Sequence, residues 1–348
     1  DFLHLRGQSQ LYMELKDAVS NFVRDHRTLY SIGRKFQGVQ FQWTYHRFYK
    51  TFSPDHKASI REIHIEPVNY CNLRCSFCAL DHDKMKVRIT PEVIRAFFDQ
   101  WMKDVRFDGL QWIHLHNGGE ALLHPKMDQI LEVFQEYKQK CRKIGKRFPK
   151  VSLLTNATVL KPEKAELLID SGIFDLFRFS VDGGTPEAFE EFRKRAKWES
   201  VRSNIEWFLV RNNRSERIAE TGIICLVPND RPLRSDWMSE DFRQLLAKVD
   251  SVEYRHAHGW AGELETEQEI AYLPEKQGCN LLVNSMVILP DGQVTVCCAD
   301  LNQRGVVGNI LKEDLFDLYA SPLRLGMIDR LAKGQKDQIP LCQDCETF

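Results

Sequence analysis

The 348-residue chain has no apolar run that approaches the roughly 18–20 residues needed to cross a bilayer, so we expect no membrane-spanning helix. It carries almost no net charge, with 48 Lys and Arg against 49 Asp and Glu. The chain therefore lacks the overall positive charge of proteins that coat nucleic acid. Its first residues form no secretory signal and include no initiator Met, so we expect a trimmed or processed cytoplasmic chain. Internal repeats and low-complexity segments are absent, and the 43% apolar content excludes a disordered protein.

The chain does contain ten cysteines, and they are clustered rather than scattered. Three lie within residues 71–78, and five lie beyond residue 278. Because no export signal is present, a disulfide framework is improbable, and clustered cysteines point to bound metal instead.

Residues 1–60 are predicted to form a helical, aromatic-rich extension. Leu11, Leu15, Val19, Phe22 and Val23 recur there at helical spacing. Two interpretations stay open: the helix packs on the main domain through this apolar stripe, or it docks a partner or a peptide.

Strands and helices alternate over residues 61–260. We expect strands at 61–66, 110–115, 151–155, 174–181, 222–227 and 251–255, and helices at 91–105, 126–144, 161–171, 185–195, 200–212 and 239–249. Such alternation indicates βαβ units around a parallel sheet. Six units are too few for a closed eightfold barrel. The predicted fold class is therefore α/β, with a partial (β/α)6 TIM-like barrel at 61–260.

Residues 261–348 have a different pattern, which predicts a small cysteine-bearing C-terminal domain of a β-hairpin plus a helix. Strands at 285–290 and 293–297 flank Asp291-Gly292, a pair that favours a type I′ turn. A helix is expected at 313–331, and a CxxC pair follows near the end of the chain.

Cys71, Cys75 and Cys78 form a CxxxCxxC run directly after the first predicted strand. Parallel α/β folds bind their ligands at the carboxyl ends of the strands. Three thiolates can hold three irons of a cubane cluster and leave the fourth iron without a protein ligand. A structural zinc site is the alternative, but zinc prefers four closed ligands from paired CxxC units, so the cluster is favoured.

This run resembles the signature of the radical SAM superfamily, including the aromatic Phe77 before the third cysteine. The resemblance implies a [4Fe–4S] cluster on Cys71, Cys75 and Cys78, whose open iron binds the amine and carboxylate of S-adenosylmethionine. It further implies that one electron cleaves the sulfonium to give a 5′-deoxyadenosyl radical, which abstracts a substrate hydrogen. Phe77 would then pack near the adenine.

A second segment fits the same family. Asn117-Gly118-Gly119-Glu120 follows the second predicted strand and looks like the family's GGE motif. By this resemblance the segment receives the methionyl amine, with Glu120 as its charged end. The glycines Gly118 and Gly119 would let the backbone approach the cofactor closely.

Further cofactor contacts are implied at the ends of the third and fourth strands. Ser180 and Asp182 resemble the polar residues that meet the ribose and carboxylate of the cofactor. Arg193 lies about one helix later, where related enzymes place a guanidinium against the methionyl carboxylate. Asn156 belongs to a Thr-Asn pair that often faces cofactor or substrate in the family.

Cys279, Cys297, Cys342 and Cys345 form a second set, which taken alone fits zinc or a closed Fe–S cluster equally well. Beside a radical SAM core, the spacing resembles the SPASM/twitch auxiliary domain and implies an auxiliary [4Fe–4S] cluster. The full SPASM pattern has seven cysteines, so we expect one auxiliary cluster, with every iron ligated. Cys298 is predicted to point to the opposite strand face and to pack in the interior.

The resemblance predicts a radical SAM oxidoreductase. The favoured reaction is dehydrogenation or epimerisation of a sugar- or aminocyclitol-like small molecule in natural-product or glycan biosynthesis, with the auxiliary cluster as electron acceptor. The first alternative is a SPASM-type peptide maturase that forms thioether or carbon–carbon crosslinks, with residues 1–60 gripping a leader peptide. The second is a non-catalytic Fe–S or zinc scaffold.

Partners and polar site residues are less specified by the pattern. We expect a flavodoxin- or ferredoxin-like electron donor as a partner. We expect no binding to nucleic acid or to membranes. Several polar or aromatic residues near strand ends are candidates for substrate contact, although a structural role is the simpler interpretation for each. They are His114, His116, Tyr254, Arg255, His256, His258 and Trp260. No catalytic base is assigned among them.

Overall fold

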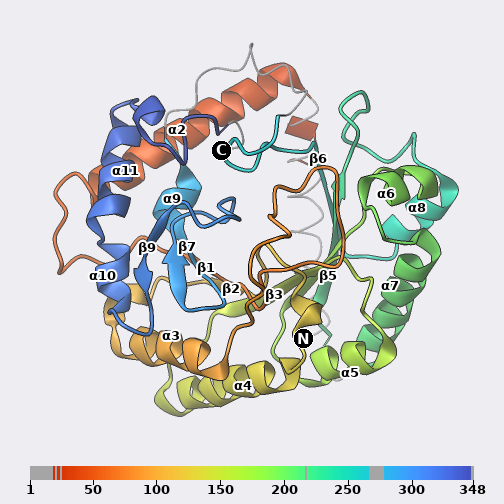
Figure 1. The fold of residues 1–348 in the computed structure, drawn as a ribbon, viewed down its shortest axis with the longest axis horizontal. Helices are drawn as coiled ribbons and strands as arrows, with labels where there is room; N and C mark the ends of the chain where they lie inside the picture. Colours follow the sequence, from red (N-terminus) through yellow and green to blue (C-terminus); the bar gives the residue numbers. More distant parts are fainter. Residues whose placement is uncertain (1–18, 20–21, 24–25, 216–217, 266–277, 346–348) are drawn as a thin grey trace. The chain divides into compact units, whose positions relative to one another are not determined.

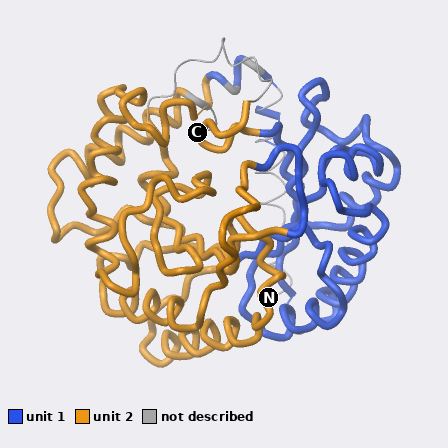
Figure 2. The backbone as a smooth tube through the Cα atoms, in the orientation of Figure 1, with its two compact units in different colours: residues 1–31, 72–78, 152–257 blue, residues 32–71, 79–151, 258–348 orange. Residues whose placement is uncertain are grey.

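The structure is a computed structural model that describes residues 19–345 apart from 20–21, 24–25, 216–217 and 266–277. Leu11 and Leu15 of the predicted N-terminal stripe lie outside the described residues. The chain divides into two compact units, coloured separately in Figure 2. Unit 1 comprises 1–31, 72–78 and 152–257, and unit 2 comprises 32–71, 79–151 and 258–348. Among the described helices, none combines the length and apolarity needed to cross a membrane.

Unit 1 is built on parallel strands that alternate with helices, as the sequence predicted. Its strands pair in the order β3 (Lys150–Thr155, from Ser152 on), β4 (Leu176–Ser180), β5 (Glu220–Leu226) and β6 (Ser251–Arg255). Its helices are α5 (Pro162–Asp170), α6 (Pro186–Phe192), α7 (Trp198–Asn213) and α8 (Glu240–Leu246), drawn in green to teal in Figure 1. Buried Phe177 and Phe179 of β4 pack against Phe208 of α7, which ties the sheet to its helices.

Unit 2 contains the first two barrel strands and the C-terminal region. β1 (Glu62–Ile65) pairs in parallel with β2 (Trp112–His114) and β7 (Ser285–Ile288), and β8 (Gln293–Thr295) and β9 (Val306–Asn309) continue the sheet antiparallel. The helices are α2 (Arg27–Phe48, from Ile32 on), α3 (Pro91–Lys103), α4 (Met127–Ile144), α9 (Asn280–Asn284), α10 (Leu315–Tyr319) and α11 (Pro322–Ala332). Helices α3 and α4 lie side by side (Figure 1), with Phe98 stacked on Tyr137 in the core between them.

The predicted hairpin around Asp291-Gly292 is present, but its turn is not type I′. Gly292 has a φ of +84°, whereas Asp291 is not among the residues with positive φ. The Leu289 amide donates to the Gln293 carbonyl at 2.8 Å, which closes a loop of three residues. A three-residue loop with a left-handed glycine is the alternative hairpin connection, so the prediction of the turn type was wrong.

The helix predicted at 313–331 is two helices, α10 and α11. Pro322 begins the second one, because proline suits the first helical position and cannot continue the preceding helix. The Ser321 hydroxyl caps it by accepting from the Arg324 amide at 3.3 Å. Strand β9 was not predicted.

Helix α2 has one face packed within unit 2 and one face exposed. On the packed side Phe41 is buried, and the Tyr45 hydroxyl donates to Asp329 of α11 at 2.9 Å. The exposed side carries four apolar residues at spacings of four, three and four, with fractional exposures of 56–70%: Ile32, Phe36, Val39 and Trp43. We call these four residues the α2 stripe. Packing and an exposed apolar face therefore coexist on one helix.

Candidate functional site

The loop that carries Cys75 and Cys78 is held by backbone bonds to the end of α6. The Arg74 amide donates to the Lys194 carbonyl at 3.2 Å, and the Ser76 amide donates to the Phe192 carbonyl at 3.0 Å. The Cys78 amide closes a turn onto the Cys75 carbonyl at 3.3 Å. Cys71, Cys75 and Cys78 are all half-buried thiols, as expected of ligands that line an accessible site.

Four of the predicted site residues come together around the Arg193 guanidinium. Arg193 Nε donates to Asp182 Oδ2 at 2.5 Å, and its guanidinium carbon lies 5.5 Å from the centre of the Phe77 ring. Arg193 Nη1 lies 4.0 Å from Cys75 Sγ. A positive charge beside a thiolate favours the deprotonated sulfur that metal binding requires, so this surrounding fits an iron–sulfur ligand.

Asp182 has its oxygens committed within the protein. Its side chain is fully buried, and Oδ1 accepts from the Leu226 amide at 2.7 Å while Oδ2 accepts from Arg193. This arrangement makes Asp182 a residue that positions Arg193. The contacts of Arg193, Asp182 and the half-buried Ser180 with S-adenosylmethionine stay predictions.

Asn156 is tied to the cysteine loop through Asn72, a residue that the sequence analysis missed. Asn156 Nδ2 donates to Asn72 Oδ1 at 3.1 Å, and Asn72 Nδ2 donates to Thr158 Oγ1 at 2.8 Å. Asn156 is 5% exposed, so it acts first as an anchor for the loop. The only sequence signal for Asn72 was its place directly after Cys71.

The Gly118–Gly119 turn is held by Glu66, a second residue that the sequence analysis missed. Glu66 Oε1 accepts from the Gly118 amide at 3.1 Å and from the Gly119 amide at 3.2 Å. A Cβ at position 119 would lie 2.0 Å from the Val68 carbonyl oxygen, so glycine is required by the chain's own backbone. Glu120 is also buried, and its side chain accepts from the Leu122 amide at 3.1 Å.

Replacing Glu66 with Gln is expected to change how stability depends on pH. Burial raises the pKa of Glu66 from 4.5 to about 7, and Lys84 opposes the rise. Because the folded-state pKa is the higher one, protonated Glu66 stabilises the fold below about pH 4.5, and this contribution is lost as the pH rises through about 7. Gln resembles the protonated form. As the pH is raised from about 5 to about 8, the free energy of unfolding of the variant should therefore exceed that of the wild type by a growing amount, up to about 3 kcal/mol.

Anaerobic unfolding in guanidinium at about pH 5 and about pH 8 measures this difference in unfolding free energy. The matched control is Glu132→Gln on the exposed face of α4, which should leave the pH dependence of unfolding unchanged. Parallel pH curves for the wild type and Glu66→Gln would show that Glu66 is charged throughout this range.

The second cysteine set is assembled within unit 2. Burial raises the pKa of Cys342, and the neighbouring Cys279, Cys297 and Cys345 raise it further, which shows that the four thiols are neighbours. Four thiolates on zinc would lie only about 3.8 Å apart, given Zn–S bonds of about 2.3 Å. Among the described residues, no three of these sulfur atoms lie within 4.8 Å of one another. Within the described part of the chain, these four thiols therefore form no ready zinc tetrahedron.

Cys298 does not occupy the predicted place. Strand β8 ends at Thr295, so Cys297 and Cys298 follow the strand and do not alternate on its faces. The Cys298 side chain hydrogen-bonds with Cys297, which helps to raise the pKa of the Cys297 thiol. The predicted strand-face argument was therefore wrong, and Cys298 lies half-buried beside the set. Cys141 and Cys225 are buried thiols, as expected.

Several of the other polar candidates have structural contacts. Arg255 pairs with Glu253 at 2.8 Å, and His256 Nδ1 lies 3.2 Å from the Val227 carbonyl oxygen. The rings of His258 and Trp260 lie 4.3 Å apart. These contacts assign none of them a catalytic role.

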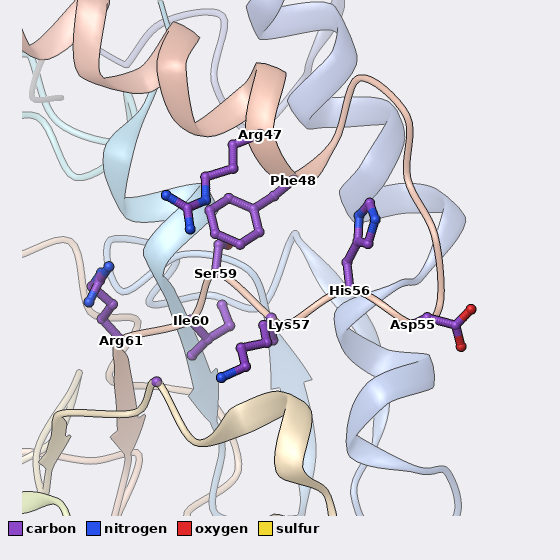
Figure 3. Close-up of a pocket in the computed structure, with 10 residues that line it drawn as sticks. Arg47, Phe48, Asp55, His56, Lys57, Ser59, Ile60 and Arg61 are labelled. Carbon is purple, nitrogen blue, oxygen red and sulfur yellow. The ribbon is translucent and has the colours of Figure 1, made fainter.

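A cavity of about 440 Å³ lies between the end of α2 and the segment before β1 (Figure 3). Arg47, Lys57 and Arg61 contribute positive charge to its lining, and Asp55 contributes negative charge. It is at the amino end of β1, whereas the cysteine loop follows the carboxyl end. Parallel α/β folds carry their reaction sites at the carboxyl ends, so this cavity is not the candidate reaction site.

Comparison with known families finds a match around each cysteine set. Residues 65–231 match the radical SAM superfamily, and residues 279–346 match an iron–sulfur cluster-binding domain, SPASM. Both matches fall within the predicted ranges 61–260 and 261–348, although the exact boundaries, and that of the extension at 1–60, stay predictions.

Individual proteins show the same relationship. The chain is 24% identical over 292 residues to AlbA, an antilisterial bacteriocin subtilosin biosynthesis protein of Bacillus subtilis (strain 168), covering 74% of this chain and 59% of AlbA. The chain thus spans less than two thirds of that relative.

Two solved structures share the fold at low identity. BtrN in complex with AdoMet and 2-DOIA is 17% identical with a TM-score of 0.55, covering 83% of this chain and 93% of BtrN. The anSMEcpe structure with AdoMet and the Cp18Cys peptide is 16% identical with a TM-score of 0.61, covering 81% of this chain and 87% of anSMEcpe. These likenesses confirm the predicted α/β partial barrel. The chain therefore carries a radical SAM domain and a C-terminal SPASM domain, from families that bind S-adenosylmethionine, a [4Fe–4S] cluster and auxiliary Fe–S clusters.

Proposed function

We propose that this enzyme dehydrogenates or epimerises a carbohydrate-like small molecule. The observation that carries the proposal is that the four cysteines of the second set, Cys279, Cys297, Cys342 and Cys345, are neighbours within one unit. A cluster with protein ligands on every iron has no open position for substrate and is suited to electron transfer. The likeness to BtrN, whose structure holds AdoMet and 2-DOIA, supports a small-molecule substrate.

The residues of this chain would bind and orient the reactants. Cys71, Cys75 and Cys78 would hold the [4Fe–4S] cluster, and Arg193, fixed by Asp182, would hold the carboxylate of S-adenosylmethionine. When bound, the cluster and S-adenosylmethionine supply hydrogen abstraction from an unactivated carbon. Glu66 would keep the Gly118–Gly119 turn in place.

The proposal is tested by anaerobic incubation of the reconstituted enzyme with reductant, S-adenosylmethionine and candidate aminocyclitols and sugars. We expect the formation of 5′-deoxyadenosine to depend on substrate. With a substrate deuterated at carbon, the 5′-deoxyadenosine should carry deuterium, and a ketone or an epimer should form. Formation of 5′-deoxyadenosine that no candidate stimulates would count against it.

Replacing Cys342 with Ala separates the two roles of iron. We expect this variant to keep cleavage of S-adenosylmethionine and to lose ketone formation by about a hundredfold or more, because the acceptor of the second electron is damaged. Cys298→Ala is the matched control and should retain product formation. Equal ketone yields from Cys342→Ala and the wild type would contradict an electron-accepting role.

Peptide maturation is the second candidate, and the exposed α2 stripe favours it. Four apolar side chains exposed on one helix face suit an amphipathic peptide partner. AlbA acts in bacteriocin biosynthesis, and anSMEcpe has been seen with a peptide. A peptide that stimulates deuterium transfer when no sugar does would favour this candidate.

The remaining partners follow from the clusters. We further propose a flavodoxin- or ferredoxin-like electron donor and a cytoplasmic location, because reduced iron–sulfur clusters need an electron source and a reducing compartment.

A further inference from the structure

Three titratable side chains of unit 2 gather on one face of strands β1 and β2. Glu62 and His64 alternate along β1, and His64 is in register with His114 of β2, so all three share a face. His114 Nε2 lies 3.6 Å from Glu62 Oε2, and the rings of His64 and His114 lie 4.7 Å apart. One ligand atom from each residue lies within 4.8 Å of the others, and no other such group is present among the described residues.

The surroundings of His64 are those of a metal ligand rather than of a core residue. Its ring hydrogen-bonds with the backbone of His116. Its other nitrogen, Nδ1, is buried and has no hydrogen-bond partner among the residues that the structure describes. A buried polar atom without a partner marks the place of an absent ion or water. A hydrogen bond from one ring nitrogen to a backbone carbonyl is the contact that orients a histidine whose other nitrogen binds metal.

Local structure explains why these polar groups can meet there. The alternate residues Ile63, Ile65 and Ile113 are buried on the opposite face, so the apolar core does not need the face of His64. Glu62 and His114 are 41% and 18% exposed at their side chains, which leaves the face accessible to an ion.

We propose that Glu62, His64 and His114 bind a divalent transition-metal ion, with Zn²⁺ as the preferred ion. Two imidazoles and one carboxylate form a ligand set of catalytic zinc sites, which keep a position open for water or substrate. Zinc binds such nitrogen and oxygen sites more tightly than Fe²⁺ does.

The place of the site in the fold indicates which ligand would bind the open coordination position of the metal ion. Glu66 directly follows β1, two residues beyond His64, and holds the Gly118–Gly119 turn. An ion held by the three residues would take a hydroxyl or carboxylate oxygen of the substrate as its fourth ligand. Metal binding itself does not depend on which substrate the enzyme uses.

The test is zinc binding to the reconstituted holoenzyme after removal of loosely bound metal with a chelator. We expect about one zinc per chain by mass spectrometry and calorimetry, and a zinc X-ray absorption spectrum with nitrogen and oxygen neighbours but no sulfur. His64→Gln and Glu62→Gln should each weaken zinc binding by at least about tenfold. His46→Gln, at an exposed position on α2, is the matched control and should bind zinc like the wild type.

Iron and sulfide contents report whether each variant keeps its clusters and its fold. If His64→Gln does not fold, the exposed Glu62→Gln decides the question. Zinc bound with sulfur neighbours, or zinc affinity equal in the wild type and Glu62→Gln, would overturn the proposal and leave the three residues as direct polar contacts for substrate.

Discussion

Replacing Cys75 with Ala is expected to remove one cluster and to abolish formation of 5′-deoxyadenosine. Three thiolates are the whole protein ligand set of a site-differentiated cluster, so two of them cannot retain it. Iron and sulfide should fall from about eight to about four of each per chain, and 5′-deoxyadenosine by at least about a thousandfold. Elemental analysis and chromatography of anaerobic reaction mixtures measure both quantities.

The matched control is Cys141→Ala, since Cys141 is a buried thiol of α4 away from both cysteine sets in the sequence. This variant should keep both clusters and the cleavage activity. A Cys75→Ala protein that retains eight irons and cleaves S-adenosylmethionine at the wild-type rate would refute the ligand assignment.

Replacing Arg193 with Met should destabilise the fold strongly. The Asp182 side chain is fully buried and pairs with Arg193 at 2.5 Å, so the substitution leaves a buried carboxylate without its counter-charge. Breaking a buried pair in this way costs about 3–5 kcal/mol of unfolding free energy. Anaerobic guanidinium unfolding measures the loss.

A second substitution separates positioning from cofactor binding. In Arg193→Met/Asp182→Asn the buried charge is removed, and Asn can still accept from the Leu226 amide, so most of the stability should return. Affinity for S-adenosylmethionine should stay low, because the guanidinium is still missing. Full recovery of affinity in the double variant would show that Arg193 has only a structural role.

The control for charge removal alone is Arg202→Met on α7. Arg202 lies 3.2 Å from Asp241, whose side chain is 46% exposed, and such surface pairs contribute only about 0–1 kcal/mol. Equal destabilisation by Arg202→Met and Arg193→Met would contradict the burial argument.

Elements with strong local signals were predicted well. α3 begins at Pro91, the predicted first residue, because proline suits the first helical position. α5 ends within a residue of its predicted end, just before Gly172, whose φ of +60° suits the residue that follows a helix. Strand β9 was missed since Val306–Asn309 is short and half-buried, and its pairing with β8 gives no periodic signal. The break before Pro322 was a local signal that the long apolar pattern obscured.

The site divides in the same way. Cys71, Cys75 and Cys78 lie close together in the sequence, so their spacing alone predicts the ligand set. Glu66 and Asn72 bind partners about 50 and 84 residues away in the chain, and a local sequence pattern cannot predict such distant contacts. Cys298 was misplaced because β8 ends at Thr295, where its pairing with β7 and β9 stops, and this pairing is not visible in the residues of β8.

The amino-acid sequence alone was enough to predict the radical SAM and SPASM families, the two cysteine sets and the order of strands and helices over residues 61–260, because these depend on residues close together in the chain. Folding was needed to bring Arg193 to Asp182 and Cys75, Glu66 to the glycine turn, and Glu62 and His64 to His114. The physical reason is that hydrogen bonds, ion pairs and metal coordination act over a few ångströms in space. Strand register and helix packing, rather than separation along the chain, set those distances.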